Sequence, residues 1–463
     1  MTLRKRSLSP RHVGFLLAVI LALGSVASAE WKEKVLYSFQ GGSDGSTPAG
    51  GVVFDSAGNL YGATTLGGSD KCIGPAQCGT VFQLTPPTQK GGSWTEVVLY
   101  VFQGKAVNDG SSPAGGVILD KAGNLYGTTA YGGAGNCTLL GGNVGCGTVW
   151  KLTPPKQKGG KWTESVIYSF QGGKDGDFPN GDLTFDKAGN LYGATAFGGG
   201  KGTSCNILFG GRCGTVFELR PPTQQGDKWT EKVLHCFAGI ESGKEHGDGA
   251  NPNGGLVLDS RGAIYGTTVW GGFLGTHCAN VGCGTTFRLQ PPKEKDGGSS
   301  ESILYEFEEY PNDGFAPYGN LALDAKGVLF GTTGGGGNHA NGVVFALSPR
   351  AGKAPWVETI AHAFEGSEGG IPTGGLIIEG SGELLGTASS YGAHFAGTVF
   401  RMQRYGAKWR LAVLYSFAGP PDAAGPSGSL AIDKAGSAYG TTQGGGTGSC
   451  QGGGCGAVFE VTP

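Results

Sequence analysis

Residues 36–68 read LYSFQGGSDGSTPAGGVVFDSAGNLYGATTLGG. Two short runs rich in β-branched and aromatic residues, 52–54 and 60–64, flank the segment Asp55-Ser56-Ala57-Gly58-Asn59. Aspartate starts a tight turn well and glycine supplies the positive φ that such a turn needs. The stretch therefore predicts two antiparallel strands joined by a hairpin, preceded by a further strand that ends at Phe39.

The same pattern recurs seven times in fixed order. A run that usually begins with Trp ends in Phe; a run opened by Pro-x-Gly follows; then comes a Leu-Tyr-Gly segment and finally a Gly-Thr-Val-Phe segment. The first run ends at Phe39, Phe102, Phe170, Phe237, Phe307, Phe364 and Phe417, and the prolines are Pro48, Pro113, Pro179, Pro252, Pro317, Pro372 and Pro426. The repeats span about 53–70 residues, and periodicity of this length indicates a propeller or a solenoid.

Each repeat supplies four strands, which cannot bury both faces of a sheet alone. Radial stacking around an axis buries them and covers the strand edges. The sequence therefore predicts an all-β, seven-bladed β-propeller of four-stranded blades, formed by residues 30–463 as a single domain. It opens with an outermost strand (31–39) and finishes with a third strand (456–462), so we expect the N-terminal strand to pair with the C-terminal blade and close the ring. A β-solenoid is the rival, but it gives no reason to begin and end in mid-unit.

The repeat consensus, LYSFxGGxDGxxPxGGLVxDxxGNLYGTTxxGG…CGTVFxLTP, resembles the GloVer tandem repeat of exported bacterial proteins. The resemblance covers essentially all of 31–463. It implies a repeated β fold outside the cytoplasm, and it implies no particular activity or catalytic residue.

Composition excludes some classes of partner. The formal net charge is −2, without the clustered basic face that nucleic acid binding needs. Glycine is abundant, at 93 residues, but it has no three-residue period and the runs between glycines are typical strands. We expect no nucleic acid partner, and we predict a monomer.

The N-terminus is typical of a signal peptide, residues 1–29. A basic region at 4–11 precedes an uncharged apolar stretch, Val13 to Gly24, and Ala27-Ser28-Ala29 has the small-x-small cleavage pattern. The apolar stretch is short for a membrane span, although an uncleaved anchor is the alternative. We therefore predict a secreted, periplasmic or cell-surface protein without a transmembrane segment after signal removal.

Ten of the eleven cysteines form close pairs at one position of the repeat. The pairs are Cys72/Cys78, Cys137/Cys146, Cys205/Cys213, Cys278/Cys283 and Cys450/Cys455. Repeats that lack one cysteine of the pair lack both, which predicts local disulfides in an oxidising compartment. Cys236 is left over, and we interpret it as a buried thiol.

An acidic residue stands four positions before the proline of every repeat. These residues are Asp44, Asp109, Asp175, Asp248, Asp313, Glu368 and Asp422. In a closed propeller they would ring the axial opening, where they could bind a cation such as calcium or the hydroxyls of a sugar. The alternative is local, because aspartate before glycine stabilises its own turn.

The loops that carry these acidic residues and the loops between second and third strands should emerge on one face of the propeller, the loop face. Large aromatic residues fall in the glycine-rich loops between second and third strands, at Tyr131, Phe197, Trp270 and Tyr391. They could stack on sugar rings or hold a peptide, or they could cover the blade tips. Four histidines lie in loops of this face, namely His246, His277, His339 and His394. They are candidate zinc or copper ligands, and His339 and His394 with Asp313 are candidate acid–base residues; solvated loop histidines are the alternative.

The sequence leaves three functions open. The first is an exported, non-enzymatic binding or scaffold protein that recognises a glycan or a cell-surface protein through this loop face. The second is a polysaccharide hydrolase or lyase, or a metal-dependent enzyme, with a site near units four to six. A purely structural surface protein is a third reading. No cofactor is required by the sequence, and calcium and zinc are the candidates.

Overall fold

The structure is a computed structural model. It describes residues 31–463 apart from 70–71, 73–77, 140, 158, 200–212, 225, 241–245, 277, 279–280, 291–297, 309–310, 312, 351–355 and 451–452. These residues form strands, turns and two short 3-10 helices, η1 (Lys105–Val107) and η2 (Gly173–Asp175). Within the described part of the chain there is no helix with the length and apolarity of a membrane span.

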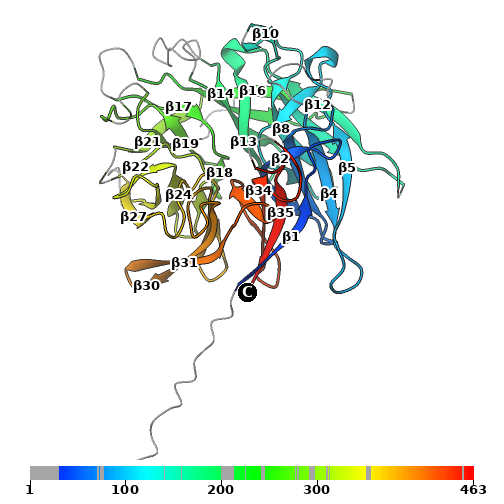
Figure 1. Cartoon of the computed structure of the whole chain (residues 1–463). Coiled ribbons are helices and arrows are strands. Elements are labelled where there is room, and N and C mark those ends of the chain that lie inside the picture. The colour runs from blue at the N-terminus through cyan, green and yellow to red at the C-terminus, as the bar shows by residue number, and fades with distance from the viewer. Residues whose placement is uncertain are drawn as a thin grey trace, which may run out of the picture.

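Among the described residues, seven antiparallel sheets of four or five strands confirm the predicted seven-bladed β-propeller, and two further sheets have two strands each (Figure 1). Blade 1 contains β2 (Ser46–Phe54), β3 (Leu60–Leu66), β4 (Thr80–Thr85) and β5 (Thr95–Val101). Blade 2 contains β6 (Gly110–Pro113), β7 (Ile118–Leu119), β8 (Leu125–Gly132), β11 (Thr148–Thr153) and β12 (Thr163–Ser169), with the hairpin β9 (Thr138–Leu139) and β10 (Gly142–Asn143) in a loop. Blade 3 contains β13 (Asp177–Phe185), β14 (Leu191–Phe197), β15 (Thr215–Arg220) and β16 (Thr230–Cys236). Blade 4 contains β17 (Ala250–Pro252), β18 (Val257–Leu258), β19 (Ile264–Trp270), β20 (Thr285–Gln290) and β21 (Ser300–Glu306).

The remaining blades repeat this order. Blade 5 contains β22 (Gly314–Phe315), β23 (Ala322–Leu323), β24 (Leu329–Thr333), β25 (Gly335–Gly336), β26 (Val343–Ser348) and β27 (Val357–Ala363). Blade 6 contains β28 (Ile377–Ile378), β29 (Leu384–Ala388), β30 (Thr398–Tyr405) and β31 (Lys408–Ser416). Blade 7 contains β32 (Ala423–Pro426), β33 (Ala431–Ile432), β34 (Ala438–Gly445) and β35 (Ala457–Thr462). Where a first strand is short, it is interrupted around the Pro-x-Gly segment.

The N-terminal strand β1 (Lys32–Ser38) lies in the sheet of blade 7. It pairs with β35 in antiparallel register, from Lys32 opposite Thr462 to Ser38 opposite Ala457. Figure 1 shows the two strands side by side, β1 in blue and β35 in red. Blade 7 thus takes its outermost strand from the opposite end of the chain.

The hairpin aspartates act as the sequence predicted. Oδ1 of Asp55 accepts hydrogen bonds from the backbone N–H groups of Ala57 and Asn59, at 2.8 and 2.9 Å. Oδ2 of Asp55 accepts a further bond from the Tyr61 hydroxyl at 3.0 Å. The tyrosine of the Leu-Tyr-Gly segment therefore ties the second strand to the turn before it, which fixes the register of the hairpin.

The hydrophobic core lies between the blades. At each junction the phenylalanine that ends one outermost strand packs edge to face on the aromatic ring of the Gly-Thr-Val-Phe strand in the next blade. The pairs are Phe39–Phe82, Phe102–Trp150, Phe170–Phe217, Phe237–Phe287, Phe307–Phe345, Phe364–Phe400 and Phe417–Phe459, with centroids 4.9–5.7 Å apart. These rings are almost completely buried, so each junction has the same aromatic centre.

The glycine of the Leu-Tyr-Gly segment is required by this packing. A Cβ atom on Gly62 would lie 2.5 Å from Cζ of Phe82, well inside van der Waals contact. We expect Gly62→Ala to lower the free energy of unfolding by about 1–3 kcal/mol, the usual cost of overpacking a core. Chemical denaturation measures the change, with Gly42→Ala as the control because nothing lies within 4 Å of that Cβ position. Equal midpoints for the two variants would contradict this account of the packing.

Candidate functional site

A cavity of about 400 Å³ lies on the propeller axis and is lined by all seven blades. Its walls come from two places: the Pro-x-Gly segments of the first strands and the ends of the second strands, represented by Thr65, Ser389 and Gln443. The cavity therefore lies toward the face from which the loops between second and third strands emerge.

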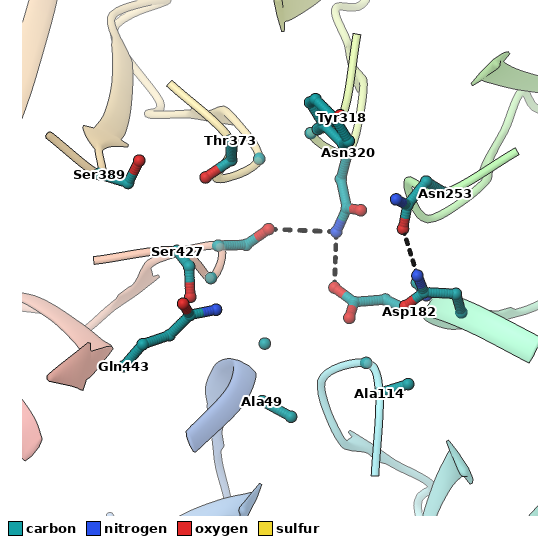
Figure 2. A pocket seen from close by; sticks show the side chains of 18 of the residues that line it. Ala49, Ala114, Asp182, Asn253, Tyr318, Asn320, Thr373, Ser389, Ser427 and Gln443 are labelled. Atoms are coloured by element: carbon teal, nitrogen blue, oxygen red, sulfur yellow. Dashed lines mark hydrogen bonds between the residues drawn. The ribbon is translucent and has the colours of Figure 1, made fainter. Parts of the chain in front are cut away.

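The lining is polar and carries one carboxylate among the described residues. Asp182, Asn320 and Ser429 occupy the position after Pro-x-Gly in blades 3, 5 and 7, where blades 1, 2, 4 and 6 have glycine. Nδ2 of Asn320 donates to Oδ2 of Asp182 at 2.6 Å and to Oγ of Ser429 at 3.1 Å (Figure 2). Oδ1 of Asp182 also accepts the backbone N–H of Gly116 at 2.5 Å. This network links three alternate blades across the axis and leaves the Asp182 carboxylate already bonded.

Other polar groups of the lining are free to meet a ligand. Oδ1 of Asn253 accepts a hydrogen bond from Nδ2 of Asn180 at 2.5 Å, and within the described part of the chain its own amide nitrogen donates to none. The hydroxyls of Tyr318, Thr373 and Ser427 likewise have no bonded partner among the described residues. Figure 2 shows these side chains around the same opening. The cavity thus offers amide and hydroxyl groups that both donate and accept.

The sequence predicted that the seven acidic loop residues would ring the axial opening. None of them lies in the lining of the axial cavity. Each instead accepts hydrogen bonds from its own loop. Oδ2 of Asp44 accepts the Gln40 N–H at 2.8 Å and the Tyr37 hydroxyl at 3.0 Å. The same tyrosine contact holds Asp109, Asp175, Asp313 and Asp422. This geometry favours the local, turn-forming role for them.

Two junctions depart from that arrangement. Histidine replaces the tyrosine at His235 and His362, at the same position of β16 and β27. Nε2 of His362 lies 2.9 Å from Oε1 of Glu368, and Nε2 of His235 lies 3.3 Å from Oδ2 of Asp248. The sequence carries this signal, tyrosine in five repeats and histidine in two, but it was not among the predicted site residues.

A second carboxyl group lies at six of the seven junctions. It belongs to the glutamate near the start of the outermost strand in the next blade: Glu33, Glu96, Glu164, Glu231, Glu301 and Glu358. Burial raises the pKa of Glu33, Glu164 and Glu358 to about 8 and of Glu96, Glu231 and Glu301 to about 7; the loop aspartate adds to the effect, and His235 opposes it at Glu301. Leu411 stands at the seventh position, beside the junction of His362 and Glu368.

The predicted aromatic residues lie on the loop face but not in the axial cavity. Tyr131 packs on Phe178 with ring centroids 4.8 Å apart, and Phe178 packs on Phe197 at 5.5 Å. Trp270 packs against the core between blades 3 and 4. Tyr391 is 37% exposed and lies near the largely exposed Phe395. Three of the four predicted aromatics therefore contribute to packing, and Tyr391 faces solvent.

The predicted histidines do not form one cluster. His339 and His394 are exposed, and no hydrogen bond or ion pair in the described part of the chain joins them to each other or to Asp313. His246 is also exposed, with Nδ1 2.5 Å from Oε2 of Glu306. His277 lies outside the described residues.

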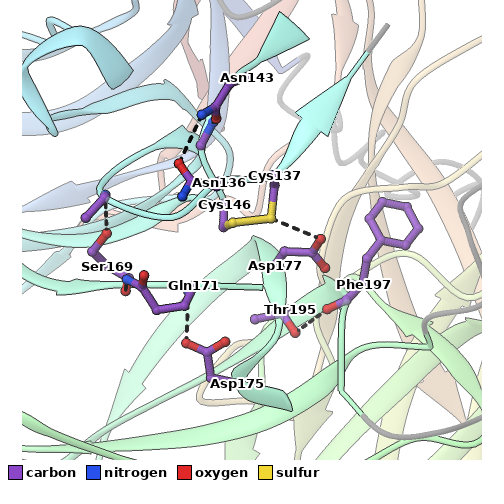
Figure 3. The surroundings of a disulfide bond; sticks show 12 residues. Asn136, Cys137, Asn143, Cys146, Ser169, Gln171, Asp175, Asp177, Thr195 and Phe197 are labelled. Atoms are coloured by element: carbon purple, nitrogen blue, oxygen red, sulfur yellow. Dashed lines mark hydrogen bonds between the residues drawn. A yellow bond between two sulfur atoms is a disulfide. The ribbon is translucent and has the colours of Figure 1, made fainter. Parts of the chain in front are cut away.

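Four of the five predicted cysteine pairs form disulfides: Cys72–Cys78, Cys137–Cys146, Cys278–Cys283 and Cys450–Cys455. Each bond lies in the loop between the second and third strands of its blade. Figure 3 shows the Cys137–Cys146 bond, with Sγ of Cys137 3.5 Å from Oδ2 of Asp177. Cys236 is half-buried rather than fully buried as the sequence predicted, and it forms no disulfide with a described cysteine.

The fifth predicted pair, Cys205 with Cys213, is not confirmed as a bond, because Cys205 lies outside the described residues. Cys213 itself is described. It is 1% exposed and packs in the core between blades 3 and 4, with Val216 and Phe237. This position immediately before β15 corresponds to that of Cys78 before β4, so the Cys205–Cys213 disulfide stays a prediction from the repeat.

The chain belongs to the Gloeobacter/Verrucomicrobia repeat family, whose sequence profile matches residues 137–377. This confirms the resemblance drawn from the repeat consensus. No curated protein sequence matches the chain significantly.

Solved structures with a similar architecture include a sialidase from Trypanosoma rangeli, with 13% identity and a TM-score of 0.40 over 82% of this chain and 57% of that one. A protein of unknown function from Dyadobacter fermentans has 12% identity and a TM-score of 0.42 over 83% and 98%. A protein named as a 6-phosphogluconolactonase from Bacteroides fragilis has 13% identity and a TM-score of 0.45 over 85% and 87%. Similarity at this level concerns architecture and says nothing about activity.

Proposed function

We propose that this protein is an exported, non-enzymatic binding module whose axial cavity recognises a hydroxyl-rich ligand, such as a sugar residue of a cell-envelope glycan. The observation that carries the proposal is the lining of that cavity, where amide and hydroxyl groups from several blades converge around one already bonded carboxylate. Sugar hydroxyls both donate and accept hydrogen bonds, and so do these groups. A cavity of about 400 Å³ is within the usual range for small-ligand sites.

A hydrolytic role has less support. Glycoside hydrolysis ordinarily uses two carboxyl groups on either side of the scissile bond. Among the described residues the cavity has only Asp182, whose two oxygens accept hydrogen bonds from Gly116 and Asn320. The carboxyl groups of the loop aspartates lie at the blade junctions, bonded to their own loops.

Export is supported by the basic and apolar N-terminal pattern of residues 1–29 and by the four disulfides. Exposed Tyr391 and Phe395 on the loop face offer a further contact for a longer glycan or a cell-surface protein. In this view the disulfides hold the loops in one conformation, which lowers the entropy lost on binding.

Binding to soluble oligosaccharides tests the proposal. Tyr318→Phe removes only a cavity hydroxyl. Asn253→Ala removes an amide whose nitrogen donates to no described residue and whose oxygen accepts from Asn180. Because one hydrogen bond contributes about 0.5–1.5 kcal/mol, we expect each variant to weaken binding by about two- to twelvefold in calorimetric titration. Tyr405→Phe and Asn338→Ala are the matched controls, since both residues are exposed and outside the cavity. Equal affinity in all four variants would place the ligand elsewhere, and turnover of the oligosaccharide would replace the binding role by a catalytic one.

A further inference from the structure

The junction between blades 3 and 4 has a chemistry of its own among the described residues. His235 on β16, Asp248 in the following loop and Glu301 on β21 each point one ligand atom at the same place, and the three atoms lie within 4.8 Å of one another. At five other junctions a tyrosine stands where His235 stands, and a phenol is a poor ligand beside an imidazole for a divalent ion. Among the described residues, this is the junction at which a histidine lies close to both the loop aspartate and the glutamate of the next outermost strand.

Two of these ligand atoms are buried without a hydrogen bond. Nε2 of His235 and Oε1 of Glu301 have no contact with solvent, and neither is hydrogen-bonded within the described part of the chain. The equivalent glutamate oxygen is also unbonded at the five other junctions that carry a glutamate, so the atom that distinguishes this junction is Nε2 of His235. A buried polar atom without a hydrogen bond is costly, and a bound cation at this point would satisfy both atoms.

Among the described residues, the carboxylate of Asp248 accepts hydrogen bonds from backbone groups only, with no tyrosine hydroxyl bonded to it. Its Oδ1 accepts the backbone N–H groups of Ala238 and Gly239, both at 2.9 Å. The other oxygen, Oδ2, accepts the backbone N–H of Ala238 at 3.2 Å and lies 3.3 Å from Nε2 of His235. At the Asp44 junction the corresponding oxygen is occupied by a tyrosine hydroxyl.

We propose that His235, Asp248 and Glu301 form a site for one divalent transition-metal ion, with zinc as the reference ion, between blades 3 and 4. Zinc bonds of about 2.0–2.2 Å to one imidazole nitrogen and two carboxylate oxygens place ligand atoms about 3.3 Å apart. The His235–Asp248 pair already has that spacing. Glu301 has a longer side chain, whose carboxylate moves toward the ion to reach the same bond length. Three protein ligands leave a fourth position open to water or to a further ligand.

The junction between blades 5 and 6 is a natural control. His362 and Glu368 lie 2.9 Å apart there, but Leu411 replaces the third carboxyl group. The donor set is therefore reduced to two, which is too few for a tight zinc site.

Zinc titration of the purified, chelator-treated full-length protein tests the proposal, with bound zinc counted by elemental analysis after desalting. We expect one ion per chain, and we expect His235→Tyr, which restores the residue of the other repeats, to weaken binding at least tenfold. His362→Tyr makes the same change at the control junction and should leave binding unchanged. His246→Ala, made in every background, removes the exposed pair of His246 with Glu306 as a competing surface site.

A gain of binding gives a second measurement. Leu411→Glu completes the donor set beside His362 and Glu368 and is expected to raise the count to two ions per chain. Calcium, which prefers sites made of oxygen ligands only, should not displace the zinc. A protein that binds no zinc, or a His235→Tyr variant that binds as much as its parent, would overturn the proposal, and circular dichroism shows that each variant is folded.

Discussion

Replacing Phe217 by alanine is expected to lower the free energy of unfolding by about 3–5 kcal/mol, the usual cost of removing a buried aromatic side chain. The Phe217 ring is completely buried and packs edge to face on Phe170, with centroids 5.1 Å apart. The two rings belong to neighbouring blades, so the variant loses a contact that holds blade 2 against blade 3. Because Gly193 faces the same ring and has no side chain, the space left by the ring cannot be filled from that side.

Urea denaturation followed by tryptophan fluorescence measures this effect. Phe395→Ala is the matched control, because that ring is 79% exposed and its loss should change the free energy of unfolding by no more than about 0.5 kcal/mol. A Phe217→Ala protein as stable as the control would mean that the blade junctions are not the main source of stability. Unfolding of one blade before the others would show as a second transition in the same experiment.

The second large effect is a loss of stability as the pH rises from 5 to 8. Burial and the nearby aspartates raise the pKa of Glu33, Glu164 and Glu358 to about 8 and of Glu96 and Glu231 to about 7, against an ordinary value of 4.5. Between these values the folded protein holds protons that the unfolded chain has released. The free energy of unfolding therefore falls with rising pH across this window.

We expect a melting temperature several degrees lower at pH 8 than at pH 5. Glu164→Gln should narrow that difference, because the amide keeps the shape of the side chain and carries no charge. Glu365→Gln is the control, since Glu365 is exposed and the change removes a charge without touching a buried glutamate. A melting temperature that is constant or rises across the window would show that these glutamates are ionised in the folded protein.

The sequence predicted the propeller because its signals are local and repeated. Asp55 and Gly58 fix a turn within a few residues, and seven copies of the same signal make the blade count secure. The four disulfides could be predicted from the spacing of the cysteines for the same reason, because each bond closes a short loop.

The candidate sites were harder to predict because they depend on contacts between distant repeats. Asp182 meets Asn320 across 138 residues, and nothing near either residue in the sequence indicates this contact. The only sequence signal for Asp182 and Asn320 was that each replaces the glycine that follows Pro-x-Gly in four of the repeats. The loop aspartates were expected at the axial opening, but a hydrogen bond to the tyrosine of the preceding strand, such as Tyr37 to Asp44, holds them at the junctions. The cluster of His235 with Glu301 could not be predicted from the sequence, because Glu301 belongs to the next repeat.

The pairing of β1 with β35 has a consequence for the order in which this protein assembles. Thr462 donates a hydrogen bond to the carbonyl of Lys32, 430 residues away, so β1 finds its partner only after β35 has been synthesised. Six blades can form from contacts within one repeat, whereas blade 7 needs two distant parts of the chain to meet, which is slow over such a separation. Until they meet, an unpaired strand edge is exposed on each side, and the nascent chain is most prone to aggregate or to exchange strands with a second copy at that stage.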